Sequence, residues 1–294
     1  MKHFRLLLIV LIFVIVSSCP IIAYAEDTWN CKCRQRLNPG CENLIIRVIM
    51  VSGPGDPVAE KQFRYDLNKA EEVINSLGIP ETHLIKHNIQ YDSKTDNANN
   101  PARTGKEFYA ALIEARSNAR DCDITIIVAQ GHASNKGVEI IRGSRNIKYN
   151  LFYGEIAMFL QSIKGHKIFI NGGCNSGSFM SNLLKVRYVL IDGMYYRVDP
   201  DQEGYNQATP LNLKNTILIS ATPLWINVLT TQTSFVKGDD TDFVPSFFNA
   251  LKKNGCDPKK AFEYESILRR GAFIKTPGLE NTIKALKSLC IECR

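Results

Sequence analysis

Long apolar runs separated by helix-like segments constrain the fold of this chain more than any other sequence feature. Each run is rich in Ile, Val and Leu and shows little alternation with polar residues. Strands that are apolar on both faces are typical of a parallel sheet covered by helices on each side. The strands expected from these runs are 44–52, 123–130, 166–170 and 216–222. The helical segments between and after them are 57–77, 104–119, 151–163, 244–253 and 280–289, with another from Ser176.

This strand–helix–strand order predicts an α/β three-layer sandwich with right-handed crossovers and a mostly parallel central sheet. The shorter segments 83–88 and 187–192 complete the expected strands, and 138–149 is expected to form a hairpin. Ligands of such sheets bind beyond the carboxyl ends of the strands. His132 and Cys174 each follow an apolar run closely, so we expect both at that edge.

The first 25 residues have the pattern of a secretory signal peptide. A basic start precedes an apolar core over 6–16 and a small-x-small site at 23–25. The apolar run is short for a membrane span. Residues 16–19 also resemble a lipoprotein signal, in which Cys19 would be acylated. We therefore expect a secreted or periplasmic protein, or alternatively one attached to a membrane through a lipidated Cys19.

Export would place the nine cysteines in an oxidising compartment, which favours disulfides. Six cysteines near the two ends of the mature chain are expected to form three disulfides, and their pairing cannot be read from the sequence. These six are Cys31, Cys33, Cys41, Cys256, Cys290 and Cys293. A metal held by the two close-spaced pairs among them is the alternative. Cys122, at the edge of a strand, is expected to be a buried free thiol.

The charge pattern excludes one class of function. The formal net charge is +7, but the Lys and Arg residues are scattered and form no basic run interleaved with aromatics. Nucleic-acid binding is therefore not expected. The acidic loops 199–204 and 238–242 lack EF-hand spacing, so we expect them to be solvated loops rather than Ca²⁺ sites. We expect no cofactor and no metal at the functional site.

Cys174 lies in the turn NGGCNSG, which has the features of a nucleophilic cysteine site. Gly172 and Gly173 permit a tight turn and the close approach of a substrate. The start of a helix after Cys174 is expected to lower the pKa of its thiol. His132, in the turn GHAS, offers an acid/base. A single such cysteine is usually a core residue and a single such histidine is usually solvated, but two beyond adjacent strands point to one site.

The order of the two residues narrows the chemistry. His132 precedes Cys174 by 42 residues, whereas papain-like proteases and α/β-hydrolases place the nucleophile first. Ser176 does not lie in a Gly-x-Ser-x-Gly elbow. On the strand ends GHAS and GGCNSGSFM, their spacing and the run RYDLNKAEEVINSLGIPETHL, the sequence resembles the caspase-like clan of cysteine peptidases. The resemblance spans roughly 44–225 and is closest to the legumain (peptidase C13) branch.

The resemblance implies a caspase-like fold and an exported cysteine endopeptidase that acts on a peptide or protein substrate. Cys174 would be the nucleophile and His132 the acid/base. The backbone N–H groups of Cys174, Ala133 and Gly173 would form the oxyanion hole. Relatives usually have glycine at the position of Ala133, where a positive φ would strain an alanine.

The resemblance also implies which residues line the primary substrate pocket. These are Arg64, Asp66, Gly172 and Ser220. Without that role, Arg64 and Asp66 would be solvated helix residues. Gly172 stands where relatives often have an acidic residue, so neither asparagine nor aspartate specificity is carried over to this chain.

The expected organisation has four parts, and two functions rival the peptidase. The parts are a leader over 1–25, a Cys-rich segment over 26–43, a peptidase domain over 44–270 and a helical, Cys-containing tail over 271–294. One rival is a catalytically inactive relative that binds a peptide or partner protein. The other is a transpeptidase or ligase, which would use the same acyl-enzyme.

Overall fold

The computed structural model places most of the chain after the Cys-rich segment. It describes residues 44–94, 96, 103–142, 148–192, 194–222, 243–263, 272–274 and 276–290. The expectations that concern residues outside this description are those for the leader, Cys19, Cys31, Cys33, Cys41, Cys293 and the loop 238–242. Within the described ranges, no helix has the length and apolar character needed to cross a membrane.

Six strands form the central sheet, in the order β11-β10-β6-β3-β1-β2. Their bounds are β1 Ile46–Ser52, β2 Leu84–Gln90, β3 Ile124–Gln130, β6 His166–Asn171, β10 Thr216–Ser220 and β11 Ala272–Ile274. Every neighbouring pair is parallel except β10 and β11. The expected α/β sandwich with a mostly parallel sheet is therefore confirmed.

Burial explains why the apolar runs became the central strands. Every residue of β1, β3, β6 and β10 is buried, so each strand is apolar on both faces. β2 lies at the edge of the sheet and is only partly covered. A short 3-10 helix at Glu81–His83 leads into it.

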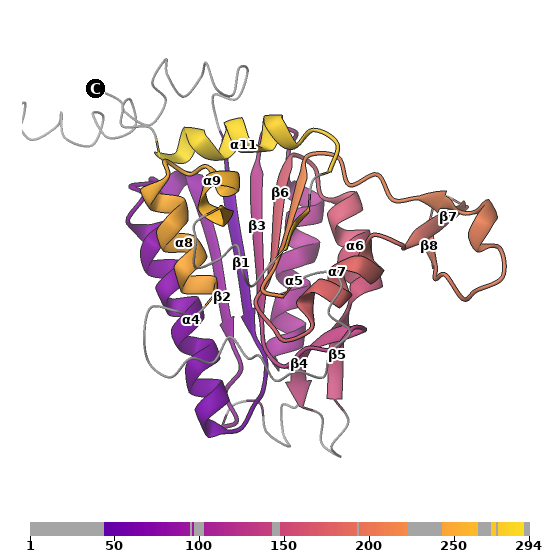
Figure 1. Cartoon of the computed structure of the whole chain (residues 1–294), viewed down its shortest axis with the longest axis horizontal. Coiled ribbons are helices and arrows are strands. Elements are labelled where there is room, and N and C mark those ends of the chain that lie inside the picture. Colours follow the sequence, from indigo (N-terminus) through magenta and orange to yellow (C-terminus); the bar gives the residue numbers. More distant parts are fainter. Residues whose placement is uncertain are drawn as a thin grey trace, which may run out of the picture.

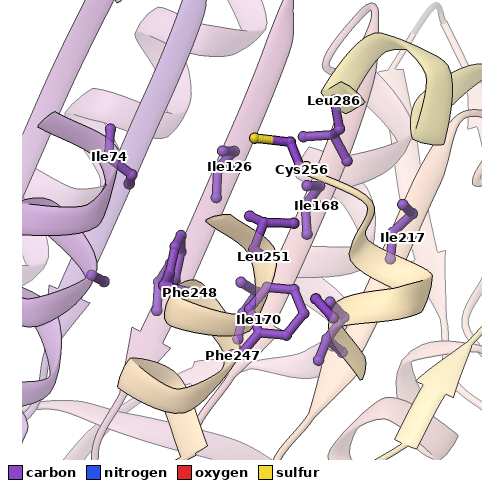
Figure 2. Packing of buried hydrophobic residues seen from close by; sticks show 14 of the residues in the cluster. Ile74, Ile126, Ile168, Ile170, Ile217, Phe247, Phe248, Leu251, Cys256 and Leu286 are labelled. Atoms are coloured by element: carbon purple, nitrogen blue, oxygen red, sulfur yellow. The ribbon is translucent and has the colours of Figure 1, made fainter. Parts of the chain in front are cut away.

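Helices cover both faces of the sheet (Figure 1). On one face lie α4 Pro57–Asn75, α8 Phe243–Lys253, α9 Pro258–Phe262 and α11 Leu279–Lys287. On the other lie α5 Arg103–Asn118, α6 Tyr153–Ser162 and α7 Ser176–Leu183. Figure 2 shows Phe247, Phe248 and Leu251 of α8 gathered beside Ile168 and Ile170 of β6. Each such buried side chain contributes about 1.5–3 kcal/mol of hydrophobic stabilisation.

The segment 187–192 is a strand, but the expectation that it joins the parallel sheet is wrong. β7 Arg187–Ile191 pairs antiparallel with β8 Met194–Val198 and β9 Thr209–Pro210, in a small sheet beside the main body (Figure 1). An antiparallel partner can follow after a short turn, whereas a parallel partner requires a long crossover. Leu190 and Ile191 accordingly remain 60% and 51% exposed.

The tail belongs structurally to the same core as the preceding residues. β11 is an edge strand of the central sheet, and α11 packs against β6 and β10. A disulfide joins Cys256 to Cys290, which ends the 3-10 helix Ser288–Cys290, with their Cα atoms 5.5 Å apart. Cys290 is therefore not available to hold a metal. Cys122 is also disulfide-bonded, so the expectation of a buried free thiol is wrong. It is only partly buried, in the turn before β3.

Candidate active site

His132 and Cys174 occupy matching positions after two neighbouring strands. In the pairing of β3 with β6, Ala129 lies opposite Asn171. His132 follows Ala129 by three residues, and Cys174 follows Asn171 by three residues. The structure therefore brings both residues to the carboxyl edge of the sheet at the same level, where this class of fold binds its ligands.

The two turns are in direct contact around Gly173. A Cβ atom built on Gly173 would lie 2.6 Å from the Gly131 oxygen and 2.7 Å from the Ala133 Cβ, the residues on either side of His132. Asn175 Nδ2 also donates a 3.4 Å hydrogen bond to the Ala133 oxygen. Any side chain at Gly173 would push the turns apart, which is a physical reason for glycine there.

Two asparagines, Asn171 and Asn175, shape the backbone of the turn that carries Cys174. Asn175 adopts the left-handed conformation, with φ 56° and ψ 16°, directly before α7. The Gly173 N–H donates a 3.0 Å hydrogen bond to Asn171 Oδ1, a side chain that is fully buried. This N–H is therefore occupied within the turn, which argues against the expected role of Gly173 as an oxyanion donor.

The Ala133 N–H, by contrast, faces the Cys174 turn. Around Ala133 the chain pairs with β4 Gly137–Arg142, the first strand of the hairpin with β5 Lys148–Phe152, which the sequence predicted. The flanking groups make the hydrogen bonds: Glu139 N donates to His132 O at 2.7 Å and Ser134 N donates to Gly137 O at 2.8 Å. In this pattern the N–H and C=O of Ala133 point away from β4, and the C=O meets Asn175. Ala133 does not adopt a positive φ, so the alanine is unstrained.

The imidazole of His132 is exposed and is supported by an aromatic contact. The ring of Phe63, a buried residue of α4, lies 5.5 Å from it between centroids in an edge-to-face arrangement of 84°. Among the hydrogen bonds of the described residues, none involves a ring nitrogen of His132. Its contact with Phe63 orients the ring while leaving both nitrogens open to a substrate. Sequence reasoning missed Phe63 because its helical spacing indicates only a core position.

Cys174 is a half-buried thiol and, among the described cysteines, the free one. Burial raises its pKa above the ordinary thiol value, although its own backbone N–H partly offsets this effect. The thiol pKa is therefore raised rather than lowered, contrary to the expectation, because burial outweighs the hydrogen bond from the Cys174 N–H. The described hydrogen bonds include none between Cys174 Sγ and His132. In the free protein the thiol is thus protonated near neutral pH.

Two of the predicted pocket residues meet through a residue that sequence reasoning missed. A Cβ atom on Gly172 would lie 1.8 Å from Gln130 Oε1 and 2.7 Å from Val244 Cγ2, so Gly172 is enclosed rather than open. Gln130 Nε2 in turn donates a 2.6 Å hydrogen bond to Asp66 Oδ2. Asp66 is only 1% exposed, contrary to a solvated helix residue. The available signal for Gln130 was a polar side chain ending an apolar strand.

The other two predicted pocket residues lie apart from this contact. Arg64 is partly exposed on α4, and its guanidinium lies 4.0 Å from the Glu60 carboxylate. Ser220, at the end of β10, is fully buried and donates a 2.7 Å hydrogen bond to the Thr222 oxygen. Thr222 Oγ1 accepts a 2.8 Å hydrogen bond from Gly177 N. Ser220 therefore supports the loop that is tied to the start of α7 and does not face an open pocket.

Comparison with known proteins gives similarity at the level of structure only. No family model and no curated protein matches this sequence. The crystal structure of the Drosophila initiator caspase Dronc is similar with a TM-score of 0.43 and 11% identity, covering 85% of each chain. Raptor of Chaetomium thermophilum is similar with a TM-score of 0.38 and 12% identity, covering 81% of this chain and 20% of that chain. Both similarities concern the arrangement of the fold alone, and neither reaches the level at which a family is assigned.

Proposed function

We propose that this protein is an exported cysteine endopeptidase of the caspase-like clan, nearest to its legumain branch, with Cys174 as nucleophile and His132 as acid/base. One observation carries the proposal: a free thiol and an exposed imidazole follow register-paired residues of adjacent strands, in turns that touch at Gly173. Two turns this close place a thiol and a base at the same edge, which nucleophilic catalysis requires.

The proposed reaction starts from a protonated thiol. On substrate binding, His132 takes the Cys174 proton, and the thiolate attacks the carbonyl carbon of the scissile peptide bond. The oxyanion of the tetrahedral intermediate accepts hydrogen bonds from the N–H groups of Ala133 and Cys174. His132 then protonates the departing amine as the C–N bond breaks, which leaves a thioester on Cys174. Water hydrolyses the thioester and returns the proton to the thiol.

The raised pKa of the Cys174 thiol supports a role for His132 as a true base rather than a mere counter-ion. A thiol that is protonated at rest needs a proton acceptor in the substrate complex. Catalytic hydrogen bonds of free enzymes are often long and tighten only when the substrate binds. The exposed imidazole supported by Phe63 has the freedom to make that closer approach.

Cleavage of a peptide library tests the proposal. Wild-type protein should cut internal peptide bonds, and Cys174→Ala should lose all cleavage while keeping its thermal stability. His132→Ala should lose at least about a hundredfold in kcat/KM, the scale of a removed acid/base. Full activity of Cys174→Ala on every substrate of the wild type would overturn the assignment.

A non-catalytic relative that binds a peptide or partner is the second candidate. One observation favours it: Gly172 is enclosed by Gln130 and Val244 rather than lining an open pocket. Absence of library cleavage, combined with retained peptide binding by Cys174→Ala, is the result this candidate predicts. A transpeptidase or ligase is recognised instead by product analysis, because an added amine would then appear joined to the new carboxyl end.

Export is part of the proposal and has its own test. Mass spectrometry of the mature protein should show a chain that begins at Glu26, after the small-x-small site. An acylated Cys19 at the N-terminus would instead establish a membrane-attached lipoprotein.

A further inference from the structure

A polar cavity lies at the edge of the sheet opposite to Cys174. Its volume is about 440 Å³, which falls in the range of small-molecule sites. The lining residues are Asp121, Gln161, Gly165, Lys167, Asn212, Lys214 and Asn215. Lys167 is the second residue of β6, and Lys214 comes two residues before β10. The cavity is therefore at the amino ends of the parallel strands, whereas Cys174 follows the carboxyl end of β6.

Within the described part of the chain, Lys167 is a buried ammonium that has no carboxylate partner. Its side chain is only 5% exposed, and its Nζ donates a 3.0 Å hydrogen bond to the Ile163 oxygen. None of the ion pairs among the described residues includes Lys167. Burial lowers its pKa to about 8, so it still carries its charge near neutral pH. Since buried charges in proteins are normally paired, this ammonium indicates a missing anionic partner.

The groups that surround Lys167 favour an anion. Lys214 is exposed at the cavity. None of the ion pairs among the described residues includes it. Asp121 is the carboxylate of the lining, and the nearby Asp123 is neutralised by Arg47 and Arg120. His166, next to Lys167, adds no charge at neutral pH because burial, together with Lys167, lowers its pKa to about 4.

Amide groups complete the set of donors. Gln161 Oε1 accepts a 2.7 Å hydrogen bond from Asn212 N, which leaves the Nε2 group of Gln161 as a donor. Lysine ammonium groups with neighbouring amides are typical partners of phosphate oxygens. A phosphate carries up to two negative charges, which Lys167 and Lys214 would balance.

We propose that this cavity is a phosphate-binding site in which Lys167 and Lys214 hold the phosphoryl oxygens and Gln161 contributes an amide donor. The occupant is either free inorganic phosphate or the phosphate group of a small organic monoester. The volume favours the monoester, because it leaves room beside the phosphate. The site does not depend on the proposed peptidase activity, so Cys174→Ala should bind as the wild type does.

Isothermal titration calorimetry of the full mature chain with inorganic phosphate and with glycerol 3-phosphate tests the proposal. At pH 7 we expect the wild type to bind at least one of the two probes, and a preference between them identifies the source. Lys214→Gln, an exposed substitution, should weaken binding at least about tenfold, the scale of one charge-assisted hydrogen bond. Lys164→Gln removes an exposed lysine beside the cavity that does not line it, and should leave the affinity unchanged.

The pH dependence of phosphate affinity distinguishes binding by the Lys167 ammonium from attraction to the general positive charge of the protein. Phosphate is already doubly charged above pH 8, so loss of affinity as the pH rises through about 8 would report deprotonation of Lys167. Lys214→Gln should keep this pH dependence, and Lys167→Met, if folded, should bind neither probe. No binding of either probe by the wild type, or equal affinities of wild type and Lys214→Gln, would overturn the proposal. So would an affinity that stays constant between about pH 8 and pH 10, where the charge of phosphate no longer changes.

Discussion

The Gln130 amide donates a 2.6 Å hydrogen bond to the Asp66 carboxylate, and both side chains are buried below the turn that carries Cys174. The other end of the Gln130 amide lies against Gly172. This contact links α4 to the turn that carries Cys174, so the position of Cys174 depends on a residue outside the turn. Gln62 donates to the same carboxylate at 2.9 Å from within α4.

Gln130→Ala should therefore lower the proposed peptidase activity as well as stability. The substitution removes a hydrogen bond to a buried carboxylate and opens a gap under Gly172, at a cost of about 1–3 kcal/mol. Gln62→Ala is the matched control, because it removes a bond to the same carboxylate without touching Gly172. We expect kcat to fall only in Gln130→Ala, measured beside urea unfolding of both variants. An equal fall in both would assign the effect to Asp66 or α4 instead.

Gly173→Ala should separate the two turns. Its Cβ would meet the Gly131 oxygen at 2.6 Å and the Ala133 Cβ at 2.7 Å, so we expect kcat/KM to fall by about a hundredfold, the effect of a displacement near 1 Å. Gly78→Ala makes the same chemical change at a positive φ of 66°, with no atom within 4 Å of the new Cβ. That control should cost about 1–2 kcal/mol of stability and leave activity unchanged. Wild-type kinetics in Gly173→Ala would show that the close contact is not needed.

The Cys256–Cys290 disulfide should stabilise the fold without serving the site. It spans a sequence separation of 34 residues, and closing such a loop contributes about 3–4 kcal/mol by the chain-entropy model. The double variant Cys256→Ala/Cys290→Ala should lose this amount in urea unfolding and keep its activity at low temperature. An unchanged unfolding free energy would contradict the prediction. The double variant is preferable to a reductant, which would also open the disulfide of Cys122.

Asp123 should make the free energy of unfolding depend on pH in the acidic range. Burial alone would raise the pKa of this carboxyl, but hydrogen bonds from Arg120, Arg47 and the Ile45 N–H outweigh burial and lower it. A depressed folded pKa means that the stabilisation is present above the unfolded value of about 3.9 and is lost as the pH falls through the folded value.

Comparison of Asp123→Asn with wild type measures this contribution. The variant should be less stable by about 3–5 kcal/mol at pH 7, because it breaks a buried ion pair with Arg47. The difference in unfolding free energy should shrink as the pH falls below about 4. The exposed carboxylate of Asp201 provides the control, since Asp201→Asn should match the wild type at each pH. A difference between Asp123→Asn and wild type that does not change with pH would contradict the prediction.

Much of the central sheet could be predicted from the sequence, because burial on both faces leaves continuous apolar runs. The location of His132 and Cys174 at one edge of the sheet could be predicted for the same reason, since each closely follows such a run. β7 could not be placed, because its run of Tyr, Val, Leu and Ile has the composition of a core strand. Only its pairing partner, Met194–Val198, decides that it lies outside the main sheet.

Properties that depend on packing between distant segments could not be predicted. The raised pKa of the Cys174 thiol comes from burial by the assembled turns, and no local pattern encodes that burial. The contact from Asp66 through Gln130 to Gly172 joins three separate segments.

The labelling rate of Cys174 by a peptidyl acyloxymethyl ketone, in wild type and His132→Ala at pH 7, tests the central claim most directly. We expect the wild type to react rapidly and His132→Ala at least about a hundredfold more slowly, because this reagent needs the acid/base. Iodoacetamide, which needs only a thiolate, should label both proteins slowly at pH 7 and faster as the pH rises above the ordinary thiol pKa. Equal rates of wild type and His132→Ala with the peptidyl reagent would contradict a Cys174–His132 site.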